Sequence, residues 1–182
     1  MQLGTGRKSI VTNFKIIGTM TDEDFDFIRT MGNYASGGHL HRLDLSEAKI
    51  DKINLEGCDA LLEIILPTDL QEIDKEAVKG CRNLAEIEMG DNITGIGNQA
   101  FIYCTSLKKV TIGANIQSIG EETFCNDDNI ETITIKQSNP PILSENTFPD
   151  ADGIKLIVPK GSNDAYWFAP GCSRLEIEEV DM

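Results

Sequence analysis

The chain has 182 residues, 40% of them apolar and 25% charged, a composition that fits one globular domain and excludes a disordered chain. With 16 basic and 30 acidic residues, its net charge is −14. Binding to nucleic acid or to an anionic membrane needs a basic face, so neither is expected. No stretch approaches the roughly 18 consecutive apolar residues of a membrane span, which argues against direct membrane insertion.

The N-terminal segment predicts a strand followed by a helix. Residues 10–20 are rich in β-branched side chains, which favour a strand. Thr21, with Asp24 three residues later, has the pattern of a capping box at a helix start, and Gly32 is a stop signal for that helix. We therefore expect residues 1–36 to form an N-terminal strand–helix cap.

The middle of the chain is an internal repeat. Cys58, Cys81 and Cys104 lie 23 residues apart, and seven apolar positions recur at fixed distances after each of them. These columns are Leu61, Leu84 and Leu107; Ile64, Ile87 and Val110; Leu66, Met89 and Ile112; Leu70, Ile93 and Ile116; Ile73, Ile96 and Ile119; Ala77, Ala100 and Thr123; and Val78, Phe101 and Phe124.

The repeat continues on both sides of these three units. A shorter unit begins at Gly37, a fourth full unit begins at Asp127, and Asp150 would open another. Phe148 falls one residue late for its column, which predicts a one-residue insertion near Pro140-Pro141.

Two of the columns predict one strand in each unit. Positions six and eight after the cysteine are two residues apart, so both side chains leave the same face of a strand. A single unit cannot bury that face alone, so neighbouring units must stack. We expect strands at 42–46, 63–67, 86–90, 109–113, 132–136 and 155–159.

The C-terminal segment predicts a second cap. Ser162 can start a short helix through Tyr166, Trp167 and Phe168, which Pro170-Gly171 ends. Three adjacent aromatic residues here are expected to seal the core. Residues 174–180 alternate in polarity and should add a last strand. The expected division is therefore a repeat array over 37–159 and a cap over 160–182, within one continuous domain.

The five cysteines do not suggest a disulfide framework, because one would be left over. The ladder of Cys58, Cys81 and Cys104 is better interpreted as small buried side chains with free thiols. Cys125 and Cys172 lie outside that ladder, and the sequence provides no role for them.

These motifs resemble a known repeat family. The segments 84–104 (LAEIEMGDNITGIGNQAFIYC) and 107–124 (LKKVTIGANIQSIGEETF) are similar to the BspA-like, bacterial surface-antigen type of leucine-rich repeat. Residues 139–171 resemble the terminal unit of such arrays in gut-type anaerobic bacteria, and residues 11–50 resemble their entry module.

The resemblance implies a fold and a location. The expected fold is an α/β leucine-rich repeat solenoid with about six stacked parallel strands of about 23-residue period, capped at both ends. The resemblance also implies export to the cell surface or the extracellular space. Residues 1–10 (MQLGTGRKSI) lack the apolar core of a signal peptide, so either the protein is cytoplasmic or its leader has been removed. The resemblance favours the second explanation.

The candidate binding surface is the outward face of the strands, at positions five and seven after each repeat start. Glu63, Glu86 and Glu88 are expected to form an acidic patch there, with lysines further along the stack. No aromatic residue occupies these positions, and a merely solvated sheet face is the simpler alternative. The candidate binding residues on this face are Arg42, Glu63, Glu86, Glu88, Lys109 and Lys155.

The sequence contains little that supports phosphate binding, zinc binding or catalysis. Residues 4–9 (GTGRKS) lack the spacing of a phosphate-binding loop, and His39 and His41 have no further ligands at zinc spacing. No nucleophile with a base and an orienting partner is visible, so we expect no catalytic residues, metal or cofactor.

Two functions are therefore expected from the sequence. The first is a non-catalytic, adhesion-type module that binds a protein on a host or bacterial surface. The alternative is a carbohydrate-recognising accessory protein of a surface glycan-utilisation system, with Tyr103, Tyr166 and Trp167 as candidate aromatic platforms.

Overall fold

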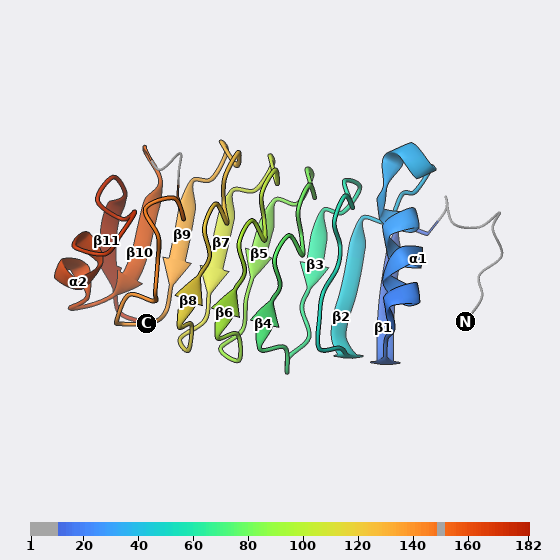
Figure 1. Cartoon of the computed structure of the whole chain (residues 1–182), viewed down its shortest axis with the longest axis horizontal. Helices are drawn as coiled ribbons and strands as arrows, with labels where there is room; N and C mark the ends of the chain where they lie inside the picture. The colour runs from blue at the N-terminus through green and yellow to red at the C-terminus, as the bar shows by residue number, and fades with distance from the viewer. Residues whose placement is uncertain (1–10, 149–151) are drawn as a thin grey trace.

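Parallel strands from successive repeats lie side by side and form an elongated stack (Figure 1). The computed structural model describes residues 11–148 and 152–182. All six predicted strands are present at the expected places: β2 (Arg42–Lys49), β3 (Glu63–Ile65), β5 (Glu86–Glu88), β7 (Lys109–Ile112), β9 (Thr132–Ile135) and β10 (Lys155–Pro159).

The 23-residue period sets the register of these strands. Glu86 pairs with Lys109, Lys109 with Thr132, and Thr132 with Lys155, each 23 residues further along the chain. Identical repeat positions therefore lie next to one another along the stack. This explains why the columns seen in the sequence become continuous rows in space.

An additional strand and a helix cap each end of the stack. At the N-terminal end β1 (Asn13–Thr19) pairs in parallel with β2, and α1 (Asp22–Gly32) is followed by the 3₁₀ helix η2 (Tyr34–Ser36). At the other end β11 (Glu176–Val180) pairs in parallel with β10, next to α2 (Asn163–Trp167). Both extra strands were predicted; the division into caps and array at residues 36 and 159 stays a prediction.

The start of α1 has the predicted cap. The Asp24 carboxylate accepts hydrogen bonds from the backbone N–H of Thr21 at 2.8 Å and from its hydroxyl at 2.9 Å. The backbone hydrogen bond is the main reason why the pKa of Asp24 is lowered. The apolar side of the helix, with Phe25, Ile28 and Met31, is buried and closes the end of the core.

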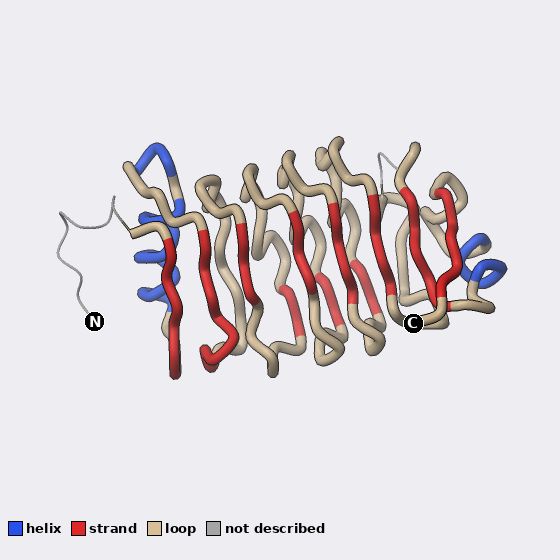
Figure 2. Tube along the Cα trace, turned by 180° about the vertical axis from the view of Figure 1, so that it is seen from behind, coloured by secondary structure: helices blue, strands red, loops and turns tan. Residues whose placement is uncertain are grey.

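A second, narrower sheet lies behind the first and was missed in the sequence. It contains β4 (Glu72–Ile73), β6 (Gly95–Ile96) and β8 (Ser118–Ile119), again in parallel and 23 residues apart. Figure 2 shows these short strands as a second row beside the longer ones. Strands of two residues are too short to show an alternating pattern, so only their buried isoleucine column was visible in the sequence.

The core lies between the two sheets and consists of the predicted columns. Every apolar member of the seven columns is buried. Phe101, Phe124 and Phe148 form a stacked row, with ring centroids 5.7 Å and 5.8 Å apart and planes within 10°. Phe148 thus occupies its column although it falls one residue late, which confirms the predicted insertion.

Left-handed residues shape the turn in five of the units. There the residue preceding the turn cysteine, or its equivalent, has a positive φ: Gly57, Gly80, Tyr103, Asn126 and Gly171. Cys58, Cys81 and Cys104 follow the first three and are buried free thiols, as predicted.

The same turn gives Cys172 a role. Cys172 follows the left-handed Gly171, and its N–H bonds the Ala169 carbonyl while its own carbonyl accepts from the Leu175 N–H. The N–H groups of Cys104 and Leu107 make the same two contacts in their unit. Cys172 is therefore the turn cysteine of the last unit, a position concealed by the irregular spacing around it.

The prediction for the three C-terminal aromatic residues was wrong for two of them. Tyr166 is fully buried and donates a hydrogen bond from its hydroxyl to the Gln137 carbonyl at 2.7 Å. Trp167 and Phe168 are 51% and 83% exposed. Successive residues on a helix point about 100° apart, so one turn can direct only one of three adjacent rings into the core.

Candidate functional site

The predicted binding residues belong to the outward face of the main sheet. In β5 the exposed Glu86 and Glu88 flank the buried Ile87, and the same alternation runs through β7 and β10. The inward side chains fill the core between the sheets, so the polar partners in each strand remain in solvent. The sequence pattern alone therefore fixes which side chains face outward.

Ion pairs between strands neutralise most of the charges on this face. Arg42 Nε lies 2.9 Å from Glu63, and Lys109 Nζ lies 3.4 Å from Glu86. Lys136 lies 3.9 Å from Glu88 and Lys155 lies 2.8 Å from Glu178; the hydrogen bond to Glu178 is the main cause of the raised pKa of Lys155. Because solvent screens these exposed pairs, each contributes little to stability.

The main sheet is interrupted between β3 and β5. One ladder joins β1, β2 and β3, and another joins β5, β7, β9, β10 and β11, whereas no ladder joins β3 to β5 within the described residues. Extending the 23-residue register would place Glu63 opposite Glu86. Like charges directly opposite each other destabilise strand pairing, which works against closing the ladder at this point.

A shallow cleft of about 530 Å³ lies over the interruption. Its charged lining consists of Glu63, Glu86, Glu88 and Lys109. Its apolar base consists of Ile65, Leu66 and Pro67. The cleft therefore combines carboxylates and an ammonium group with an apolar base. Such a surface can bind a partner that presents both charge and apolar area.

The six predicted site residues do not all lie at the cleft. Four line this cleft, and Arg42 adjoins it through its ion pair with Glu63. Lys155 lies three strands away from β5, on β10 beside β11, and does not belong to the cleft. Pro67 and Thr68 were not singled out in the sequence; the available signal was Pro67, which stands where the next two units have Gly90 and Gly113.

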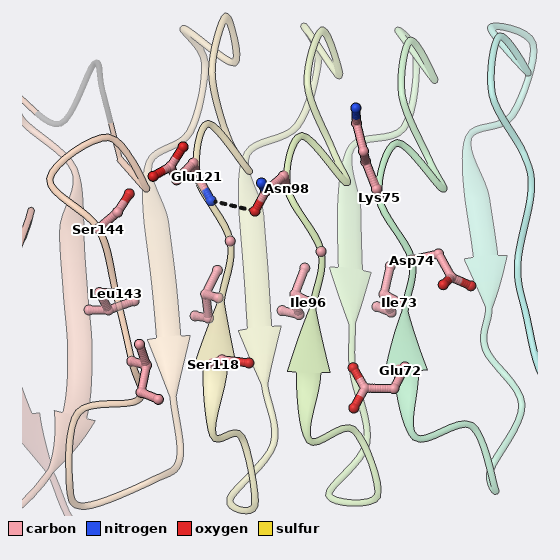
Figure 3. A pocket seen from close by; sticks show the side chains of 14 residues that line it. Glu72, Ile73, Asp74, Lys75, Ile96, Asn98, Ser118, Glu121, Leu143 and Ser144 are labelled. Carbon is pink, nitrogen blue, oxygen red and sulfur yellow. Dashed lines mark hydrogen bonds between the residues drawn. The ribbon is translucent and has the colours of Figure 1, made fainter.

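A larger groove of about 630 Å³ runs over the narrow sheet of β4, β6 and β8 (Figure 3). Ile73, Ile96 and Leu143 lie along it, and the Glu121 N–H donates to Asn98 Oδ1 at 3.1 Å. None of the predicted site residues lines this groove.

Two glycines of this groove serve the packing of neighbouring turns. A Cβ at Gly97 would approach the Lys75 nitrogen to 2.5 Å, and one at Gly120 would approach the Asn98 nitrogen to 2.5 Å. Successive backbones approach this closely only without side chains at these positions. The groove thus follows from close turn packing.

Other candidate chemistry is limited in the described part of the chain. Residues 4–9 lie outside it, and His39 and His41 belong to no group of three or more possible metal ligands in residues 11–148 and 152–182. No helix in those ranges has the length and hydropathy needed to cross a bilayer. Burial raises the pKa of Cys58 and of Cys172 to about 12, so neither thiol is suited to be a nucleophile.

Solved structures share this architecture. The pneumococcal vaccine antigen PcpA matches 94% of this chain with a TM-score of 0.69 at 21% sequence identity, and this chain spans 42% of PcpA. The T. pallidum leucine-rich repeat protein TpLRR matches 94% of this chain with a TM-score of 0.55 at 18% identity, over 71% of its own chain. At such identities the likeness establishes the fold, a leucine-rich repeat solenoid with about six turns.

Sequence comparison assigns the family. No curated protein sequence matches the chain. The family model described as a BspA type leucine rich repeat region matches six times, over residues 41–155. This range covers more than half of the 182 residues and includes the first five predicted strands and the first residue of the sixth. The chain therefore belongs to the BspA-type leucine-rich repeat family.

Proposed function

We propose that this protein is a non-catalytic binding module that recognises a protein partner on a host or bacterial surface through the outward face of its main sheet. The observation that carries the proposal is the cleft between β3 and β5, which gathers Glu63, Glu86, Glu88 and Lys109 around an apolar base. Leucine-rich repeat families are typically non-catalytic and mediate protein binding. Display at a bacterial surface is part of the proposal and is supported by the likeness to the pneumococcal antigen.

The charges on this face favour a partner with its own complementary pattern. Each predicted site residue already has an ion-pair partner within the chain, so a ligand must exchange these pairs for others. Electrostatic complementarity of this type determines orientation and association rate more than affinity, and salt weakens it. Binding should therefore weaken as the salt concentration rises.

The test begins with the immobilised chain and panels of extracellular-matrix and bacterial surface proteins, at low and high salt. The decisive variant exchanges the charges of one pair, Glu86→Lys with Lys109→Glu. These two side chains lie 3.4 Å apart in the parent chain, and the exchange retains an ion pair between them. We expect it to fold normally and to lose at least about tenfold in affinity, equivalent to about 1.4 kcal/mol.

A matched control exchanges an ion pair away from the cleft. Lys160 and Asp181 lie 3.5 Å apart and are both exposed. The variant Lys160→Asp with Asp181→Lys should bind the partner as the parent does. Unchanged binding by the Glu86/Lys109 exchange, with a partner that the parent captures, would exclude this face.

A further inference from the structure

An exposed aromatic residue occupies a backbone position that other repeats reserve for small residues. This position directly precedes the turn cysteine or its equivalent. Its φ angle is 74° at Gly57, 72° at Gly80, 65° at Tyr103, 61° at Asn126 and 74° at Gly171. Glycine adopts this left-handed conformation freely, and asparagine tolerates it. A bulky ring there is an outlier, and backbone strain of this kind concentrates at functional sites.

The ring of Tyr103 is available to a ligand. Tyr103 is 45% exposed, and its hydroxyl has no hydrogen-bond partner among the described residues. It stands beside a shallow pocket of about 310 Å³, at the edge of the solenoid where the main strands begin. The volume is at the lower end of the range for ligand sites, which fits one or two sugar units.

Two glycines line this pocket. Gly57 and Gly80 hold the same repeat position as Tyr103 in the two preceding units. A Cβ built on either glycine would be in ordinary van der Waals contact at 3.9 Å, with Asn33 Nδ2 at Gly57 and with the Gly57 backbone at Gly80. A ligand in this pocket can therefore contact backbone at the two glycines and the tyrosine ring at its edge.

The walls of the pocket are polar and balanced in charge. They include two carboxylates, from Glu56 and Asp59, and two cations, from Lys79 and Arg82. Lys79 lies 3.1 Å from Glu56, whereas the Arg82 guanidinium has no ion-pair partner within the described residues. The charges cancel, so the pocket favours a neutral ligand with many hydroxyl groups over an ion.

We propose that this pocket binds a pyranose sugar unit of a neutral glycan. A pyranose has an apolar face of C–H groups that stacks on an aromatic ring, and hydroxyl edges that pair with carboxylates and with the arginine fork. Tyr103 provides the ring, and Asp59 and Arg82 provide the hydrogen bonds. This site lies apart from the β3–β5 cleft, with no lining residue in common, and does not depend on the proposed protein-binding function.

The test is saturation-transfer NMR of the full chain with five disaccharides: maltose, cellobiose, lactose, mannobiose and chitobiose. The main variant is Tyr103→Asn, because asparagine occupies the same left-handed position at Asn126. It removes the ring without imposing a new backbone conformation. We therefore expect its thermal midpoint to equal or exceed that of the parent chain, which separates loss of binding from loss of folding.

We expect at least one disaccharide to bind the parent chain and Tyr103→Asn to weaken that binding about tenfold. Arg82→Ala should weaken it as well. Trp167→Ala is the matched control, because Trp167 is similarly exposed at the far end of the stack. The proposal is wrong if the parent binds none of the five sugars, if Tyr103→Asn binds as the parent does, or if Trp167→Ala abolishes binding.

Discussion

Position within the repeat decides the environment of each cysteine. Cys81 and Cys104 occupy the turn and donate from Sγ to the carbonyls of Leu55 and Val78, at 3.3 Å and 3.2 Å. Burial raises the pKa of both thiols well above the ordinary value of 9.0, because the thiolate would lose its hydration. Cys125 lies outside the turn column and is partly exposed. The turn thiols thus behave as small apolar side chains.

Thiol labelling tests this difference between positions. At pH 8 in native buffer we expect an aromatic disulfide reagent to react first with Cys125, because only a thiolate attacks and the other four thiols are buried. All five cysteines should react after unfolding in guanidinium. Cys125→Ala is the control and should remove the rapid reaction. Rapid labelling of Cys58, Cys81, Cys104 or Cys172 in that variant would contradict the buried ladder.

At the scale of elements, the phenylalanine row connects successive turns of the stack. Phe124 lies between Phe101 and Phe148, and all three rings are buried. The first full unit has Val78 in this column, so the row begins only in the second unit. Each ring contacts its neighbours in the adjacent units, which couples the stability of one repeat to the next.

Truncation of the central ring tests that coupling. Phe124→Ala should lower the free energy of unfolding by about 3–5 kcal/mol, because it leaves a cavity between two stacked rings. The measurement is urea denaturation followed by circular dichroism. Phe168→Ala is the matched control: this ring is 83% exposed, so its removal should change stability by less than about 0.5 kcal/mol. Equal losses in the two variants would argue against the stacked row as a source of stability.

For the whole molecule, the extra strands β1 and β11 cover the two ends of the stack. β11 covers the edge of β10, and the buried Tyr166 anchors α2 against the Gln137 carbonyl. Without this cap, the edge of β10 and the buried Leu156 and Val158 would meet solvent. Uncovered edge strands and cores favour association between chains.

Deletion of residues 160–182 should therefore cause aggregation and lower the thermal midpoint. Size-exclusion chromatography and thermal denaturation measure the two effects. Deletion of residues 181–182 alone is the control and should change neither, because both residues are exposed and follow β11. A monodisperse protein with an unchanged midpoint after the longer deletion would show that the array needs no cap at this end.

The sequence by itself determined the repeat and its consequences. The period of 23, the strand positions, the inward columns, the insertion before Phe148 and the buried cysteine ladder all follow from local repetition. These features are predictable because stacking places identical positions side by side, so a pattern along the chain becomes a pattern in space. The outward direction of the candidate binding residues follows from the same alternation.

Only the tertiary structure decided where the repetition fails. The interruption between β3 and β5 depends on which charges meet across two strands, and so does the pairing of Glu86 with Lys109. The choice of Tyr166 as the one buried C-terminal ring, and the pocket beside Tyr103, depend likewise on neighbours distant in sequence. Local periodicity fixes the direction of a side chain, whereas its partners are set by the packing of units against one another.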